Sequence, residues 1–213
     1  MKAEYIDHMG TDDDVVDAAR VSFAKTAEKF TPEQNKGLIR FLARNNHWTP
    51  FAHTAIKLRM TAPVPIRTQC FKHKQGFTEN EESRRYISSR PELYVPDHFR
   101  EKPEGNVKQG SAGRHIDSDF WQDQYKAKCE EAISLYEHMV LDGVCPEQAR
   151  FVLPQGVEVT WIWTGNLAAF ARFYNQRTDS HAQKEIQELA QQVGKIIEPL
   201  FPVSWAALTS TDN

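Results

Sequence analysis

The stretch Ile56-Lys57-Leu58-Arg59-Met60-Thr61 alternates apolar and polar side chains at every position. Because successive side chains of a β-strand point to opposite faces of a sheet, this period of two predicts a half-buried strand. Pro63 and Pro65 follow within a few residues and are expected to end it. The chain is therefore expected to contain a sheet with one face toward a core.

Helical patterns precede this strand. Asp12-Asp13-Asp14 is expected to provide the N-cap of a short helix that ends near Ser22-Phe23. Thr31-Pro32-Glu33 is expected to open a second helix, because proline is favoured in the first turn. The predicted inner face of this second helix consists of Leu38, Ile39, Phe41 and Leu42.

Helical spacing returns in the second half of the chain. Apolar residues from Trp121 to Val140 predict a helix that stops at Gly143. Another helix is predicted to end near Arg177, and Ser180-His181-Ala182-Gln183 has the pattern of a capping box that would start the next one. Together these patterns predict an α+β fold, in which mixed helices pack on a β-sheet in a single domain over 1–213.

The composition limits the functions that the chain can have. Its 213 residues include 40% apolar and 26% charged side chains, which is ordinary for a globular domain. A formal net charge of −3 and a pI of about 6.2 argue against a broad electrostatic grip on nucleic acid. No apolar run suits a secretory signal or a membrane span. Cys70, Cys129 and Cys145 form no close-spaced metal pair, so we expect no metal site and a reducing, cytoplasmic location.

Apolar residues nearly vanish between Asp97 and Asp119, where Gly, Lys, Ser and Glu dominate. We expect a mobile loop over 97–119 instead of a domain boundary, because the helix that follows needs a core to pack on. The loop is therefore assigned to the same domain.

The segment from Gln69 to Tyr86 combines cations with carboxylate, amide and hydroxyl side chains. Its cations are Lys72, His73, Lys74, Arg84 and Arg85, and its other polar groups are Glu79, Asn80, Glu81, Glu82 and Ser83. Cations bind phosphate oxygens, whereas the other groups bind ribose and base edges. The segment therefore predicts a nucleotide site, although a run of this kind standing alone is a solvated charged loop about half the time.

A second candidate constellation lies in the last third of the chain. Its members, spaced three or four residues apart on one predicted helix face, are Asn166, Phe170, Phe173 and Arg177. Arg177 and His181 would meet at a junction between two helices, where a guanidinium can bind an anion or polarise a carbonyl. Taken without Arg177, the same face is more typical of a core helix with one polar end.

Several of these residues also have simpler interpretations. Arg150 could cap a helix or pair with Glu147. Cys70 is expected to be a small buried filler and not a nucleophile. Trp161 and Trp163 are expected in the core.

The motifs follow one another in a definite order. Lys72-His73-Lys74 is followed by Thr78, Asn80-Glu81, Ser83 and Arg85-Tyr86. Further blocks are Ala18-Ala19-Arg20-Val21-Ser22, Thr49-Pro50-Phe51 with His53, Ala149-Arg150-Phe151-Val152-Leu153-Pro154, Trp163-Thr164 with Asn166, and the segment from Arg177 to Ile186. In this order they resemble the flavin-dependent thymidylate synthase family, whose signature is an Arg-His-Arg triplet followed by Ser, Asn-Glu, Ser and Arg-Tyr.

The chain departs from that signature at several positions. Lysines replace both arginines of the triplet, which keeps the charge but loses the bidentate guanidinium fork. One extra residue separates His73 from Thr78, Ala52 stands where Glu is common, and Arg172 stands where a smaller polar residue can occur. These changes concern contacts to a cofactor more than the reaction.

The resemblance implies an enzyme that converts dUMP to dTMP by reductive methylation. Methylenetetrahydrofolate would donate the carbon and NADPH would reduce a bound FAD, because hydride transfer is beyond ordinary side chains. The resemblance also implies a homotetramer with active sites shared between chains. We expect small-molecule substrates and no nucleic acid, membrane or metal partner.

The resemblance further implies roles for individual residues. Arg177 would lie over the uracil ring and stabilise developing negative charge, while Ser83 would orient the nucleotide. The residues implied to bind dUMP are Gln69, Cys70, Phe71, Lys72, Glu81, Glu82, Ser83, Arg84, Arg85, Arg150 and Arg177. Those implied to bind FAD are Thr49, Lys72, His73, Lys74, Glu81, Asn166, Arg172 and His181.

Two other classes of function are weighed beside this one. A flavin-free nucleotide enzyme would need a cysteine nucleophile, but none of the three cysteines has an adjacent base motif. A single-stranded nucleic-acid-binding module without catalysis would use the cations of the 69–86 segment, with Phe71, Phe77 and Tyr86 as stacking platforms. The acidic balance and the glutamates interleaved in that segment argue against it.

Overall fold

A four-stranded antiparallel sheet forms the centre of the computed structural model, which describes residues 1–105 and 110–210. In spatial order the strands are β1 (Lys2–Met9), β2 (Ala55–Pro63), β4 (Glu158–Gly165) and β3 (Phe77–Glu81). The predicted strand is confirmed within β2, where Ile56, Leu58 and Met60 are buried. The α+β fold class is confirmed as well.

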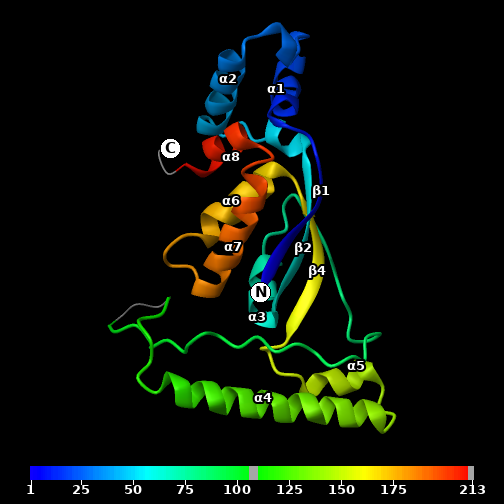
Figure 1. Cartoon of the computed structure of the whole chain (residues 1–213). Coiled ribbons are helices and arrows are strands. Elements are labelled where there is room, and N and C mark those ends of the chain that lie inside the picture. Colours follow the sequence, from blue (N-terminus) through cyan, green and yellow to red (C-terminus); the bar gives the residue numbers. More distant parts are fainter. Residues whose placement is uncertain (106–109, 211–213) are drawn as a thin grey trace.

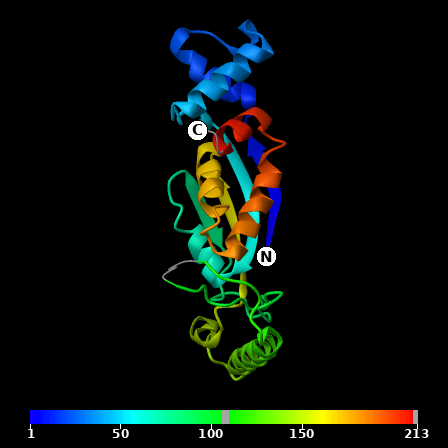
Figure 2. The same ribbon diagram turned by 90° about the vertical axis from the view of Figure 1, so that its left-hand side faces the viewer.

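The helices cover one face of the sheet and extend beyond both of its ends (Figures 1 and 2). The helices α6 (Leu167–Arg177) and α7 (Lys184–Ile197) lie across the face, with α8 (Pro202–Thr209) next to them. At one end lie α1 (Asp12–Arg20) and α2 (Pro32–Arg44), and at the other lie α4 (Ser118–Leu141) and α5 (Pro146–Ala149). The short α3 (Val64–Cys70) follows β2 directly. Single turns of 3-10 helix are η1 (Val21–Phe23), η2 (Ala27–Lys29), η3 (Pro50–His53) and η4 (Arg150–Val152).

Aromatic side chains fill the space between the sheet and α6. Trp161 and Trp163 on β4 are buried, as expected, and so are Phe170 and Phe173 on α6. The ring of Phe77 stacks on Trp163 with centroids 4.2 Å apart. Truncating one buried aromatic side chain of this kind typically costs about 3–5 kcal/mol of stability. This packing holds β3, β4 and α6 in fixed relative positions, and with them Glu81 at the end of β3 and Arg172 and Arg177 on α6.

The predicted start of α2 is correct, whereas the predicted N-cap of α1 is wrong by one residue. Thr31 forms a capping box with Gln34 at the start of α2. The Thr31 side chain accepts from the main-chain amide of Gln34, and the Gln34 side chain accepts from the main-chain amide of Thr31. At α1 the N-cap is Thr11, and the three aspartates occupy the first turn, where their charge suits the helix dipole. The predicted inner face of α2 is wrong at Phe41, which is 47% exposed.

The predicted capping box at Ser180 is wrong. The α7 helix begins at Lys184, with Gln183 at the N-cap position. The Asp179 side chain instead accepts from the main-chain amide of His181, and the main-chain carbonyl oxygen of Asp179 accepts from the amide of Ala182. These bonds form a tight turn after α6, so the chain turns once more before the next helix starts.

The expected loop over 97–119 has irregular conformation in its described part, and α4 begins at Ser118. Residues 106–109 of this loop lie outside the described residues. An isolated antiparallel bridge joins Arg100 to Arg114. The mobility of the loop stays a prediction.

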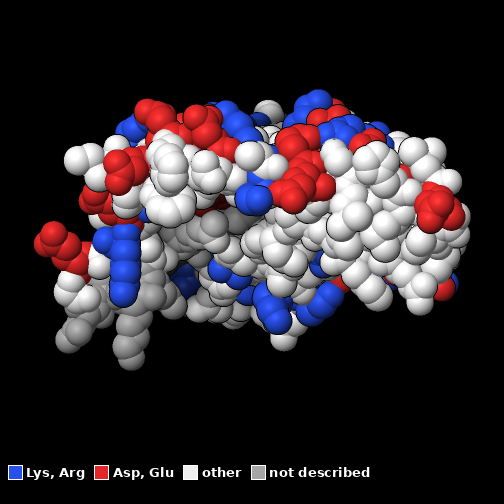
Figure 3. Space-filling model, turned by 90° about the horizontal axis from the view of Figure 1, so that it is seen from below, with Lys and Arg blue, Asp and Glu red and all other residues white. Residues whose placement is uncertain are grey.

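Figure 3 views the molecule from the end at which α4 lies. Acidic and basic side chains are interspersed along one margin of this face, and the part near the C-terminal end of α4 is largely uncharged. Among the described residues, no helix combines the length and the apolar character that a membrane span requires.

Candidate active site

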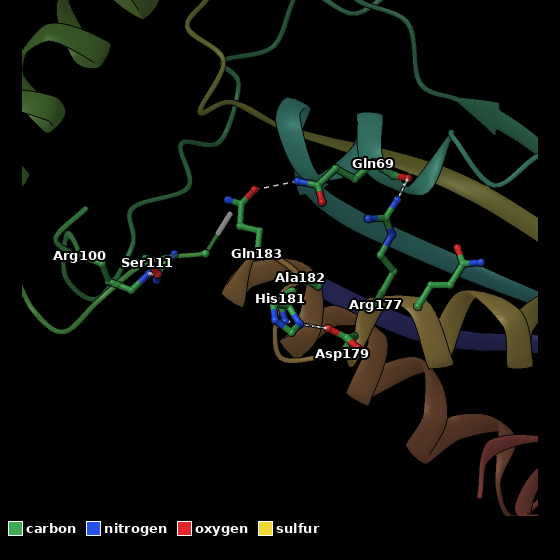
Figure 4. A pocket seen from close by; sticks show the side chains of 10 residues that line it. Gln69, Arg100, Ser111, Arg177, Asp179, His181, Ala182 and Gln183 are labelled. Atoms are coloured by element: carbon green, nitrogen blue, oxygen red, sulfur yellow. Dashed lines mark hydrogen bonds and ion pairs between the residues drawn. The ribbon is translucent and has the colours of Figure 1, made fainter. Parts of the chain in front are cut away.

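A cavity of about 630 Å³ lies where α3, the turn between α6 and α7, and the segment before α4 meet (Figure 4). The lining residues are Gln69, Arg100, Gly110, Ser111, Gln176, Arg177, Asp179, His181, Ala182 and Gln183. The cavity therefore brings together three of the predicted site residues, Gln69, Arg177 and His181. It also includes residues that the sequence analysis did not assign.

Arg177 is the last residue of α6, where a positive charge is favourable because the carbonyl end of the helix carries partial negative charge. Its Nε donates to Nε2 of His73 at 2.9 Å, and its Nη2 lies 3.4 Å from the main-chain carbonyl oxygen of Gln69. These two contacts leave N–H groups of the guanidinium free to face a ligand. The side chain is thus anchored on one side and available on the other.

His73 is the buried partner that holds this arginine. It is 8% exposed, and its ring meets the edge of Phe173 at a centroid distance of 5.1 Å. Burial, together with the nearby charges of Arg177 and Arg172, lowers the pKa of His73 to about 4. His73 is therefore neutral near pH 7, and because Nε2 accepts from Arg177, its proton resides on Nδ1.

His181 lies on the rim of the same cavity, in the turn after α6. Its Nδ1 is 2.9 Å from the Asp179 carboxylate, and its side chain is 78% exposed. The main-chain and side-chain hydrogen bonds of His181 lower the pKa of Asp179. This pair places a carboxylate and an imidazole at the entrance.

The turn between α3 and β3 gathers most of the residues implied to bind FAD. Lys72 and Lys74 are exposed there, although Lys74 pairs with Glu79. Arg172 reaches this turn from α6 and donates to the carbonyl oxygen of Gln75 at 2.5 Å.

Gly76 lets this turn pack closely against the start of α6. Its φ is +79°, and a Cβ atom at this position would lie 2.8 Å from the amide nitrogen of Asn166. Asn166 is the N-cap of α6, since its Oδ1 accepts from the amide of Ala169 at 2.9 Å. Thr49 is exposed just before η3, which packs near α6. Asn166 and Arg177 thus stand at opposite ends of α6 instead of forming one compact group.

Glu81 closes β3 and pairs with Arg67 of α3 at 2.8 Å. Burial raises the pKa of Glu81, while the Arg67 charge opposes this rise. Each of the two side chains is about one-quarter exposed, at 25% and 24% respectively. The pair joins the two elements on either side of the cationic turn.

A second group of cations lies near α5 and does not line the cavity among the described residues. Arg85 pairs with the Glu147 carboxylate at 3.3 Å, and Arg150 donates to the Glu147 carbonyl oxygen at 3.2 Å. The simple interpretation of Arg150 as a helix-end contact is therefore correct for the single chain. Directly after β3, the amide of Glu82 donates to the carbonyl oxygen of Thr160 on β4. In the turn that follows, the amide of Arg85 donates to Oγ of Ser83, and the Arg84 side chain donates to the carbonyl oxygen of Ser89.

One residue that the resemblance implies as a substrate contact is buried away from the cavity. Cys70 belongs to the buried core, and burial raises the pKa of its thiol to about 12. Its side chain can neither line the cavity nor act as a nucleophile near neutral pH. Burial also raises the pKa of Cys129, and no group of ligands able to hold a metal occurs among the described residues.

The stacking platforms of a nucleic-acid-binding module are also largely occupied. Phe77 is covered by Trp163, and Phe71 meets the edge of Trp161 at 5.6 Å. Tyr86 is 79% exposed. One free ring does not make the row of platforms that single-strand binding uses.

Arg100, Ser111 and Gln183 are among the cavity residues that no sequence motif assigned to the site. Arg100 donates to Ser111 at 2.7 Å and to the buried Glu185 at 2.6 Å. Gln183 and Glu185 lie inside the segment that follows Arg177. Their closeness in sequence to that motif could have indicated that they belong to the site. Arg100 stands in a stretch without any periodic pattern.

Known proteins match both the sequence and the fold. The family model described as thymidylate synthase complementing protein matches residues 4–203. A flavin-dependent thymidylate synthase of Thermosipho africanus is 34% identical over 206 residues, which cover 95% of this chain and 88% of that relative. One of Thermus thermophilus is 33% identical over 202 residues, with coverage of 95% and 73%.

A solved structure agrees with this relation. It is the UMP/dUMP methylase PolB from Streptomyces cacaoi bound with 5-Br dUMP, which has a TM-score of 0.87 and 30% identity. The match covers 98% of this chain and 94% of that one. With a family model that spans nearly the whole sequence, the chain belongs to the flavin-dependent thymidylate synthase family, the family of the thymidylate synthase complementing protein.

Proposed function

We propose that this protein converts dUMP to dTMP by reductive methylation. Methylenetetrahydrofolate would supply the carbon, and NADPH would supply reducing equivalents through FAD. The family, together with a solved relative titled a UMP/dUMP methylase, supports the nucleotide substrate. The observation that carries the proposal is Arg177, a guanidinium held by a neutral buried histidine at the wall of a nucleotide-sized cavity.

Arg177 would act on the pyrimidine ring. Its free N–H groups can donate to the carbonyl oxygens of uracil, where negative charge develops when the ring carbon attacks an electrophile. Because His73 and Gln69 already hold the guanidinium, little reorganisation is needed when the charge forms. Arg177 is therefore assigned the catalytic role, and Ser83 is assigned the orientation of the nucleotide.

The donor set around the 72–76 turn fits a flavin dinucleotide. Lys72, Lys74 and Arg172 provide positive charge for its diphosphate, and Asn166 marks a helix N-terminus beside them. We assign FAD binding to these four residues with Thr49, His73, Glu81 and His181. Bound FAD would supply hydride transfer, which no side chain can provide.

The separation of the two cation groups supports an active site shared between chains. The cations Arg84, Arg85 and Arg150 suit the phosphate of dUMP but do not line the Arg177 cavity in one chain. We propose that they belong to the corresponding cavity of a neighbouring copy in a homotetramer.

The proposal is tested by an absorption spectrum of the purified protein, followed by anaerobic addition of NADPH and then dUMP with methylenetetrahydrofolate. We expect a flavin spectrum that NADPH bleaches, and dTMP among the products. A protein that neither carries nor takes up FAD, or that forms no dTMP when reduced, would contradict the proposal.

A further inference from the structure

Three side chains form a hydrogen-bonded line that leads from the wall of the Arg177 cavity to a buried carboxylate. Nε2 of Gln69 donates to Oε1 of Gln183 at 2.7 Å, and Nε2 of Gln183 donates to Oε2 of Glu185 at 2.9 Å. Arg100 occupies the other carboxylate oxygen of Glu185 at 2.6 Å. Figure 4 shows the contact between the two amides and, beside it, the contact of Arg177 with the Gln69 main chain.

The carboxylate at the end of this line determines the direction of every bond in it. Burial raises the pKa of Glu185, but hydrogen bonds from Arg100, the main chain and Gln183 lower it more, so the group is ionised at neutral pH. An ionised carboxylate only accepts hydrogen bonds. Gln183 must therefore turn its NH₂ group to Glu185 and its carbonyl oxygen to Gln69.

The same constraint passes to the next amide. Because Gln69 meets a carbonyl oxygen on Gln183, it must present its own NH₂ group there. Its second side-chain atom, Oε1, is then left as an acceptor at the cavity. The orientation of an amide is ordinarily ambiguous, and here the chemistry of Glu185 resolves it.

The cavity wall thus combines one acceptor with adjacent donors. Gln69 provides the acceptor, and the free N–H groups of Arg177 provide the donors. A uracil ring has the complementary pattern, because its N3–H lies between two carbonyl oxygens. Cytosine has an acceptor at N3 and an amino group in place of one carbonyl oxygen, so it would place acceptor against acceptor.

We propose that Glu185 and Gln183 are positioning residues that hold the side-chain oxygen of Gln69, Oε1, toward the cavity. The site would thereby select a uracil ring over a cytosine ring. The inference rests on the proposed function and deepens it by naming how the base is chosen. Arg100 contributes by fixing the other oxygen of Glu185. Gln183 is exposed and Gln69 is half-buried in the free chain, so the selection depends on a bound ring that excludes water.

The exchange Glu185→Gln tests the direction of the line. Arg100 would still require an oxygen at position 185, so the new NH₂ group would face Gln183. Both following amides would reverse, and Gln69 would present its NH₂ group to the cavity. Equilibrium dialysis of dUMP and dCMP with the purified protein measures the result without any need for turnover.

We expect the ratio of dUMP to dCMP affinity to fall roughly tenfold in Glu185→Gln, the usual effect of one mismatched hydrogen bond. Glu188→Gln is the matched control, because it removes the same charge from an exposed position on the same helix. An unchanged ratio in Glu185→Gln, or an equal fall in both variants, would overturn the inference.

A second variant tests the direction of the line from its other end. The double exchange Glu185→Gln with Gln69→Glu leaves the reversed Gln183 facing a carboxylate, which again presents an acceptor to the cavity. We expect it to recover the preference for dUMP. A wild-type protein that binds no dUMP would contradict the proposed function. If the wild type binds dUMP but the folded double variant does not recover the preference, only the positioning role of Glu185 and Gln183 is contradicted.

Discussion

The two groups of arginines in this chain differ in how they are held. Arg177 is anchored by buried His73 and by the main chain of α3, so its direction is fixed before any ligand arrives. Arg85 and its partner Glu147 are each about half exposed, at 51% and 53%, and such surface pairs hold their side chains weakly. From this difference we propose that the first group stabilises the transition state of a reaction and the second captures an anion.

The largest effect is expected at the anchored group. Arg177→Ala should lower the rate of dTMP formation about 100- to 1000-fold, because it removes a preorganised donor to developing negative charge. The bound flavin should remain, which an absorption spectrum would show. The exposed Arg44→Ala is the matched control and should keep full turnover. Normal turnover in Arg177→Ala would remove the catalytic assignment.

The exposed group should act mainly on binding. The double exchange Arg85→Ala with Arg150→Ala should raise the KM for dUMP roughly 10- to 100-fold, the usual range for charged hydrogen bonds to a phosphate, with a smaller effect on kcat. Steady-state kinetics over a wide range of dUMP concentration measures both constants. If kcat fell as far as it does in Arg177→Ala, the contrast between the two groups would be lost.

Ser83 lies next to the exposed group and should have a milder effect. Ser83→Ala is expected to raise the KM for dUMP by roughly tenfold or less, since it removes one neutral hydrogen bond that orients the nucleotide. The same kinetics decide the point. Equal losses in kcat and kcat/KM would instead assign the hydroxyl a part in the chemistry.

The last effect concerns stability and its dependence on pH, and not the reaction. The pKa of His73 is lowered to about 4 in the folded protein, so the unfolded chain binds the extra proton first and stability falls as the pH drops from about 6.5 toward 4. By pH 5 the loss should be on the order of 2 kcal/mol. Urea denaturation of the wild type and His73→Gln at pH 7 and pH 5 isolates this contribution. The variant should lose less stability than the wild type, and equal losses would show that His73 titrates normally.

The regular parts of this architecture are local and could be predicted. Alternation from Ile56 to Met60 marks a strand with one buried face, and Thr31 with Gln34 satisfies the first amides of α2. The end of α6 at Arg177 also follows from spacing and motif. The capping box predicted at Ser180 is wrong, because Asp179 accepts from the amides of His181 and Ala182 and closes a turn before α7 begins.

The cavity wall could not be predicted in the same way. Arg100 meets Glu185 across 85 positions of sequence, from a stretch with no periodic pattern. By contrast, Cys70 is buried as predicted for a small apolar filler, although its motif position implied a ligand contact. Motif order could indicate which residues belong to a site, whereas their directions required the fold.

The most direct test of this account asks whether the two arginine groups complete one site across chains. Chains carrying Arg177→Ala and chains carrying both Arg85→Ala and Arg150→Ala would be co-expressed with different tags and purified through both. At low dUMP concentration, each variant alone should form little dTMP. We predict that the doubly purified assembly recovers dTMP formation, because some sites would contain both intact groups. An assembly as inactive as its parts would place both groups in the site of a single chain and contradict the account.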